Sequence, residues 1–97
     1  MTERRSDKYY SELEERLRSL MPLAARLLSP EVVKWYTEYL DAGEYGLAVE
    51  VAAEGLPADA RRSQFRELAV ALLAEAEVMG VAEPAADRLR ALAAWDP

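Results

Sequence analysis

Apolar residues recur at helical spacing along most of this chain, and that periodicity constrains the fold more than any other feature of the sequence. Residues three and four positions apart share one face of an α-helix. Ala and Leu dominate the apolar set, Ile is absent, and Val stands beside Ala and Glu rather than in alternating runs, which argues against strands. The longest stripe consists of Phe65, Leu68, Ala69, Leu72, Leu73, Ala76 and Met79. We therefore predict an all-α fold.

Start and stop signals divide the pattern into four to five helices. The first helix carries Tyr10, Leu13 and Leu17 on its buried stripe, and Pro22 is expected to kink or break it. The last helix opens near Pro84. Between them, three helices are expected at residues 30–42, 45–55 and 58–79. With 97 residues there is room for one core only, so residues 1–97 form a single domain with flexible ends at 1–5 and 95–97.

The middle of the chain predicts an antiparallel helical hairpin. Ser29 can cap a helix, Pro30 suits its first position, and Gly43 supplies the left-handed residue that ends it. The connection to the next helix is short, so the two helices must be antiparallel neighbours. On the second helix we expect Leu47 and Ala48 to face inward, and on the first we expect an apolar arc through Val32, Val33, Tyr36 and Leu40. The fold expected is a compact bundle around this central hairpin.

The chain lacks the residue types on which most catalytic sites depend. The chain has no Cys and no His, so it lacks thiolate ligands, the usual general base and the usual imidazole ligand. Its four glycines do not form a phosphate-binding loop. Glu50 and Glu54 share a helix face, but nothing in their surroundings predicts the shifted pKa that acid–base catalysis needs. We therefore expect no enzymatic activity, no catalytic residue, no cofactor and no metal site.

Net charge and hydropathy limit the classes of partner that the chain is expected to bind. A formal charge of −6 disfavours nucleic acid as a ligand. No apolar run is long enough to span a membrane, and the first ten residues lack the apolar segment of a signal peptide. These observations predict a cytoplasmic protein that binds neither nucleic acid nor membrane.

Negative charge is concentrated in the predicted hairpin. Residues 29–56 contain six acidic side chains and a single lysine, Lys34. The same segment holds four of the eight aromatic residues. Carboxylates can steer a basic partner and exposed aromatic rings can anchor it. We therefore expect a partner-binding surface made of Glu31, Trp35, Glu38, Tyr39, Asp41, Glu44, Tyr45, Glu50 and Glu54. A solvated acidic face that only keeps the domain soluble is the alternative interpretation.

A second, weaker stripe follows the long helix on its far side and consists of Val70, Ala74 and Val78. Two apolar sides favour a helix that is central to the bundle and covered on both flanks. The alternative is a homodimer contact, because exposed apolar patches often mark interfaces. A structural or scaffolding module built on such a dimer is therefore a second candidate function.

The chain resembles two known families. The spacing of Trp35, Tyr39, Gly43, Ala48 and Pro57 resembles one tetratricopeptide unit, although Tyr36 departs from that pattern. A solenoid needs at least three such units, so this likeness supports only the hairpin.

The second resemblance covers more of the chain. The stretches 28–33, 39–50 and 72–81 are similar to the MafI-type immunity proteins, with Gly43, Glu44, Leu47, Ala48 and Glu50 as the core of the likeness. This resemblance implies a helical bacterial protein of the cytoplasm that binds a toxin domain and blocks it. The expected partner is thus a basic toxin domain, for instance a nuclease with a groove for phosphates.

Overall fold

The computed structural model describes residues 7–57, 63–81 and 84–94, and these ranges form six helices without a strand. The helices are α1 (Asp7–Ser19), α2 (Met21–Leu27), α3 (Pro30–Asp41), α4 (Tyr45–Gly55), α5 (Ser63–Met79) and α6 (Ala85–Ala93). The predicted all-α bundle is confirmed. The predicted flexible ends, 1–5 and 95–97, and the start of the long helix at residues 58–62 lie outside the described residues.

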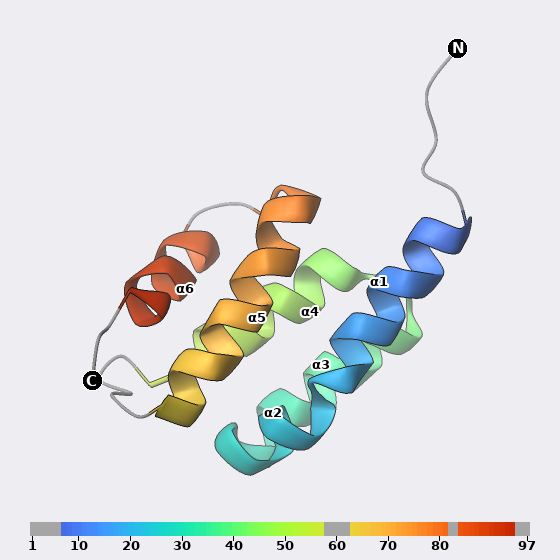
Figure 1. The fold of residues 1–97 in the computed structure, drawn as a ribbon. Coiled ribbons are helices and arrows are strands. Elements are labelled where there is room, and N and C mark those ends of the chain that lie inside the picture. Colours follow the sequence, from blue (N-terminus) through green and yellow to red (C-terminus); the bar gives the residue numbers. More distant parts are fainter. Residues whose placement is uncertain (1–6, 58–62, 82–83, 95–97) are drawn as a thin grey trace.

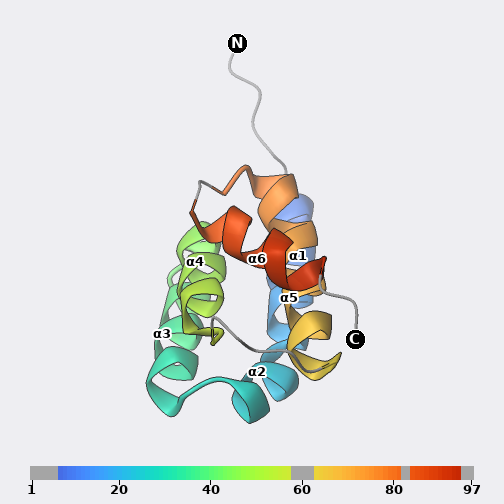
Figure 2. The same cartoon turned by 90° about the vertical axis from the view of Figure 1, so that its left-hand side faces the viewer.

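The helices pack in two groups around a shared core. Helices α3 and α4 form an antiparallel hairpin on one side, and α1, α2 and α5 lie opposite (Figures 1 and 2). Helix α6 packs on α5 and α4 and covers one end of the gap between the two groups (Figure 2). The central hairpin predicted from the sequence is therefore present, and one face of each of its helices remains outside the bundle.

The boundaries of the hairpin follow from local chemistry. Ser29 Oγ accepts a hydrogen bond from the amide of Val32 at 3.2 Å, which caps α3. Gly43 has a φ of +74°, and the amide of Glu44 donates back to the carbonyl of Tyr39 at 2.8 Å, which ends the helix in a left-handed turn. The predicted start and stop residues of α3 are thus confirmed.

Pro22 separates α1 from α2. Proline has no amide hydrogen, and its ring clashes with the carbonyl four residues earlier when it stands inside a helix. Helix α1 ends at Ser19, and Pro22 stands in the first turn of the seven-residue helix α2. The predicted break is confirmed, and the short helix that follows it accounts for a sixth element.

The core is built from the predicted stripes of α1, α3, α4 and α5. On α5, Leu68, Ala69, Leu72 and Ala76 are buried. Tyr36 of α3 is fully buried, and its hydroxyl donates to the carbonyl of Leu17 at 2.6 Å. A buried hydroxyl needs such a partner, because an unpaired one is costly to remove from water.

Two residues expected inside are exposed instead. Tyr10 and Leu47 each keep 43% of their surface exposed. In α4 the inward face is formed by Ala48, Val49, Ala52 and Ala53, which leaves Leu47 on the outer side. In the first turns of α1, Tyr9 rather than Tyr10 packs against the core, because adjacent residues point about 100° apart on a helix.

The second stripe of α5 is not covered by neighbouring helices. Val70 and Val78 keep 43% and 47% of their surface exposed, and Ala74 between them is also exposed. The neighbours of α5 pack on its other faces, so the prediction that both apolar sides would be covered is wrong for this stripe. The exposed stripe remains compatible with the alternative of a contact between two copies.

A pair of opposite charges joins α1 to α5. The carboxylate of Glu75 is buried and accepts hydrogen bonds from Arg16 Nε at 3.0 Å and Arg16 Nη2 at 3.1 Å. Paired bonds of this kind fix both side chains in one geometry. The pair closes the outer side of the contact between the two helices.

The hairpin depends on a close approach of α3 and α4 at Gly55. A Cβ atom at Gly55 would lie 2.8 Å from Cγ1 of Val32, whose branched side chain has little rotamer freedom. We expect Gly55→Ala to lower the free energy of unfolding by about 1–3 kcal/mol through overpacking. Gly46→Ala is the matched control, because a Cβ there meets no atom within 4 Å.

That control substitution places alanine in the same helix and is expected to be neutral or stabilising by up to about 1 kcal/mol. Urea denaturation of both variants measures the difference. Equal stability of the two variants would contradict the close approach.

Candidate partner-binding surface

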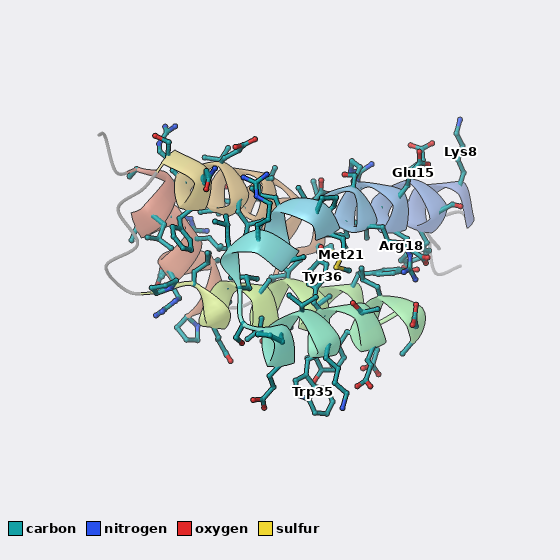
Figure 3. The ribbon with its side chains drawn as sticks, turned by 90° about the horizontal axis from the view of Figure 1, so that it is seen from below. Lys8, Glu15, Arg18, Met21, Trp35 and Tyr36 are labelled. Carbon is teal, nitrogen blue, oxygen red and sulfur yellow. The ribbon has the colours of Figure 1, made fainter. Side chains whose placement is uncertain are left out.

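The outer face of α3 carries four of the nine predicted residues. Glu31, Trp35, Glu38 and Tyr39 follow one another at helical spacing, and we call them the α3 face. Trp35 keeps 43% of its surface exposed, and its ring lies 6.0 Å from the ring of Tyr39. Figure 3 shows Trp35 pointing away from the body of the domain, whereas its neighbour Tyr36 points inward. The α3 face therefore combines an exposed indole with carboxylates on the same helix.

The lysine of this segment lies beside the indole. Lys34 Nζ is 6.0 Å from the centre of the Trp35 ring, at the limit for a cation–π contact. Its charge offsets one of the nearby carboxylates. Glu31 and Glu38 form no ion pair with another residue of the ranges that the structure describes, so the α3 face keeps a negative balance.

Asp41, at the end of α3, already has a partner. Arg18 of α1 donates from Nη2 to Asp41 at 2.8 Å and from Nε to Glu14 at 2.7 Å. Figure 3 shows Arg18 on the side of α1 that faces α3. Because Arg18 balances its charge, Asp41 has less negative charge to offer a partner than Glu31 or Glu38.

Tyr45 extends the same network to the start of α4. Its hydroxyl donates to Glu14 at 2.6 Å. This hydrogen bond, together with the one from Arg18, holds the pKa of the Glu14 carboxyl below its ordinary value. The same bond raises the pKa of the Tyr45 phenol, because it favours the protonated form. Tyr45 is therefore tied to α1 and only half-exposed.

Glu44, Tyr45 and Glu50 lie on a second surface, away from the α3 face. They line a groove of about 520 Å³ between the start of α1, the start of α4 and the end of α5. We call it the tyrosine groove. Its lining comprises Tyr9, Tyr10, Leu13, Gly43, Glu44, Tyr45, Gly46, Leu47, Glu50, Met79, Gly80 and Val81.

Tyrosine rings dominate one side of this groove. The rings of Tyr9 and Tyr10 meet edge to face at 5.2 Å, and the rings of Tyr10 and Tyr45 are stacked at 6.3 Å. The exposed side chain of Leu47 also lies in the lining. The sequence interpretation did not include Tyr9, Tyr10 or Leu47 in the site. A signal was present, since two consecutive aromatic residues cannot both face the core of one helix.

The ninth predicted residue, Glu54, is exposed one turn beyond Glu50 and does not line the groove. The structure thus places seven of the nine predicted residues in two clusters and leaves Asp41 and Glu54 outside both. One cluster is the α3 face, and the other is the tyrosine groove.

Both clusters combine carboxylates with partly exposed aromatic rings. Within the described ranges there is no group of three or more Asp and Glu side chains placed to hold a metal ion. None of the helices described is both long and apolar enough to cross a membrane.

Comparison of the chain with protein-family models, with curated proteins and with solved structures finds no match. The chemistry of its own surfaces is therefore the guide to its function.

Proposed function

We propose that this chain is an immunity protein of the cytoplasm, which binds a basic toxin domain and neutralises it by stoichiometric inhibition. The observation that carries the proposal is the exposed indole of Trp35 on a helix face with unpaired carboxylates. Tryptophan is frequent among the residues that dominate binding energy, and this indole is accessible to a partner. The resemblance of stretches of the sequence to MafI-type immunity proteins implies the same function.

The proposed mechanism has two stages. Carboxylates of Glu31, Glu38 and Glu54 attract the positively charged toxin domain and orient it during the encounter. Trp35 and Tyr39 then lose water against the partner and hold the complex together. If the toxin is a nuclease, its phosphate-binding groove is the basic surface that such a face would cover.

Co-expression tests the proposal directly. The chain is produced together with a candidate toxin domain, chosen from any toxin gene found beside its own, and survival of the cells is the readout. We expect survival with the chain and death without it. Survival that does not depend on the chain, or purified proteins that fail to associate, would count against an immunity function.

The anchor role predicts a large effect at Trp35. Trp35→Ala is expected to weaken the complex by about 2 kcal/mol or more, which is roughly 30-fold in Kd. Glu38→Gln on the same face should cost only about 0.2–1 kcal/mol, because exposed ion pairs contribute little. Calorimetric titration measures both. Val70→Ala on α5 is the control, and wild-type affinity of the Trp35 variant would place the interface elsewhere.

Steering predicts a strong dependence on salt. Raising the ionic strength from about 50 mM to about 500 mM shortens the screening length severalfold, so the association rate should fall by about tenfold or more. The dissociation rate should change much less. Stopped-flow fluorescence of Trp35, measured in a variant whose second tryptophan is replaced (Trp95→Phe), follows both rates. An association rate that is the same at low and high salt would rule out steering by these carboxylates.

A structural or scaffolding homodimer is a second candidate, favoured by the exposed stripe Val70, Ala74 and Val78 on α5. Apolar side chains at this spacing form a continuous strip that a second copy can cover. Analytical ultracentrifugation separates the two candidates. A dimer at micromolar concentration that becomes a monomer in Val70→Lys would favour this function over the first.

A further inference from the structure

The tyrosine groove has the size and the walls of a ligand site. Its volume of about 520 Å³ falls within the roughly 300–1,000 Å³ of typical ligand clefts. Tyr10 and Leu47, both 43% exposed, leave aromatic and aliphatic surface available to a ligand. The stacking of Tyr10 on Tyr45, whose hydroxyl is bonded to Glu14, fixes the rings before any ligand arrives.

The charges of the groove have one sign. Among its lining residues the charged side chains are Glu44 and Glu50, and neither forms an ion pair within the described ranges. Glu44 precedes α4, yet its side chain makes no capping hydrogen bond to that helix. Both carboxylates are therefore available to a cation that enters the groove.

Aromatic rings beside unpaired carboxylates suit one kind of side chain in particular. A guanidinium group is planar, stacks on aromatic faces and donates paired hydrogen bonds to a carboxylate. An ammonium group is a compact, strongly hydrated charge that gains less from stacking. We propose that the tyrosine groove binds an arginine side chain presented by a partner protein.

The α3 face and the tyrosine groove then contact the same partner at two places. This step rests on the proposed function, because it assigns the arginine to the toxin domain. The preference of the groove for arginine does not depend on it. A titration with a short peptide therefore tests the groove without any toxin. The co-expression experiment tests the immunity function and does not depend on the groove.

The probe is the peptide acetyl-Gly-Arg-Arg-Gly-amide, titrated into the full chain and followed by NMR. Its matched control replaces both arginines with citrulline, which has nearly the same shape and no charge. The resonances observed are the rings of Tyr10 and Tyr45, the methyl groups of Leu47 and, for the other surface, the indole of Trp35. We expect the arginine peptide to shift the groove resonances with saturation and the citrulline peptide to leave them nearly unchanged.

Variants then separate the contributions of charge and stacking. Glu50→Gln and Tyr10→Leu are each expected to weaken peptide binding by roughly two- to fivefold. Glu77→Gln is the control, since it removes the same charge from an exposed position on α5 outside the groove. Tyr10 is not part of the buried core, so Tyr10→Leu should keep the helical circular dichroism spectrum.

Several results would overturn the inference. Equal resonance shifts with the two peptides would show that the groove does not recognise the guanidinium group. Shifts of the Trp35 resonances alone would show that arginine binds to the α3 face instead. If Glu77→Gln weakens peptide binding as much as Glu50→Gln does, the effect comes from the overall charge of the chain and not from the groove. If the peptide does not bind to the groove while the chain still binds and neutralises the toxin, the inference about the groove is wrong and the proposed function stands.

Discussion

Replacing Tyr36 by alanine is expected to lower the free energy of unfolding by about 3–5 kcal/mol, the range for large aromatic side chains deleted from a core. Tyr36 is the largest of the fully buried side chains within the described ranges, and it lies between α3 and α1 (Figure 3). Its removal leaves a cavity and also deprives the carbonyl of Leu17 of the hydroxyl that donates to it. For a domain of this size such a loss is a large part of the total stability.

Urea denaturation of Tyr36→Ala and Tyr36→Phe separates the two contributions. The phenylalanine variant keeps the ring and loses the hydroxyl, so it should cost only about 0.5–1.5 kcal/mol, the usual net contribution of one hydrogen bond. If both variants lose the same amount of stability, packing of the ring is not what holds α3 against α1.

Stability is also expected to fall steeply in alkaline solution, because burial raises the pKa of the Tyr36 phenol well above its ordinary value near 10. Above pH of about 10 the unfolded chain loses the phenolic proton while the folded chain keeps it. The unfolded state then binds fewer protons, so the free energy of unfolding decreases by about 1.4 kcal/mol per pH unit from this group. The contribution is fully present below pH of about 10 and disappears as the pH rises toward the folded-state pKa.

Tyr36→Phe isolates this effect, since the variant has no phenol to ionise at that position. Denaturation midpoints measured at pH 8, 10 and 11 should fall more steeply for the wild type than for the variant. Tyr45→Phe should remove a smaller part of the slope, because the pKa of Tyr45 is raised in the same direction by its hydrogen bond to Glu14. Parallel pH profiles of wild type and Tyr36→Phe would show that the buried phenol does not control alkaline unfolding.

The sequence predicts those parts of the fold that depend on interactions between residues close together in the chain. Ser29 and Pro30 start α3 and Gly43 ends it through interactions that span only a few residues. The buried stripe of α5 follows from spacing alone. Trp35 stands next to Tyr36 of the predicted apolar arc, and because adjacent residues point about 100° apart on a helix, its exposure follows from the same geometry.

The parts that could not be predicted depend on contacts between distant segments. Arg16 binds Glu75, which lies 59 positions along the chain, although Glu12 stands one turn away on the same helix. Likewise, the tyrosine groove forms only where α1, α4 and α5 meet, so Tyr10 and Glu50 cannot be placed together from their own neighbourhoods. Helical periodicity fixes which face of each helix is apolar, but it does not fix which helix covers that face.

The opposite directions of Trp35 and Tyr36 determine how recognition proceeds. Rotating α3 to hide the indole would draw the neighbouring phenol out of the interior, so a rotation of this helix cannot mask the anchor while the core stays intact. The ordering of this surface is completed during folding rather than during the encounter. A partner therefore meets a preorganised site, and complex formation is expected to follow a single bimolecular step without a slow isomerisation.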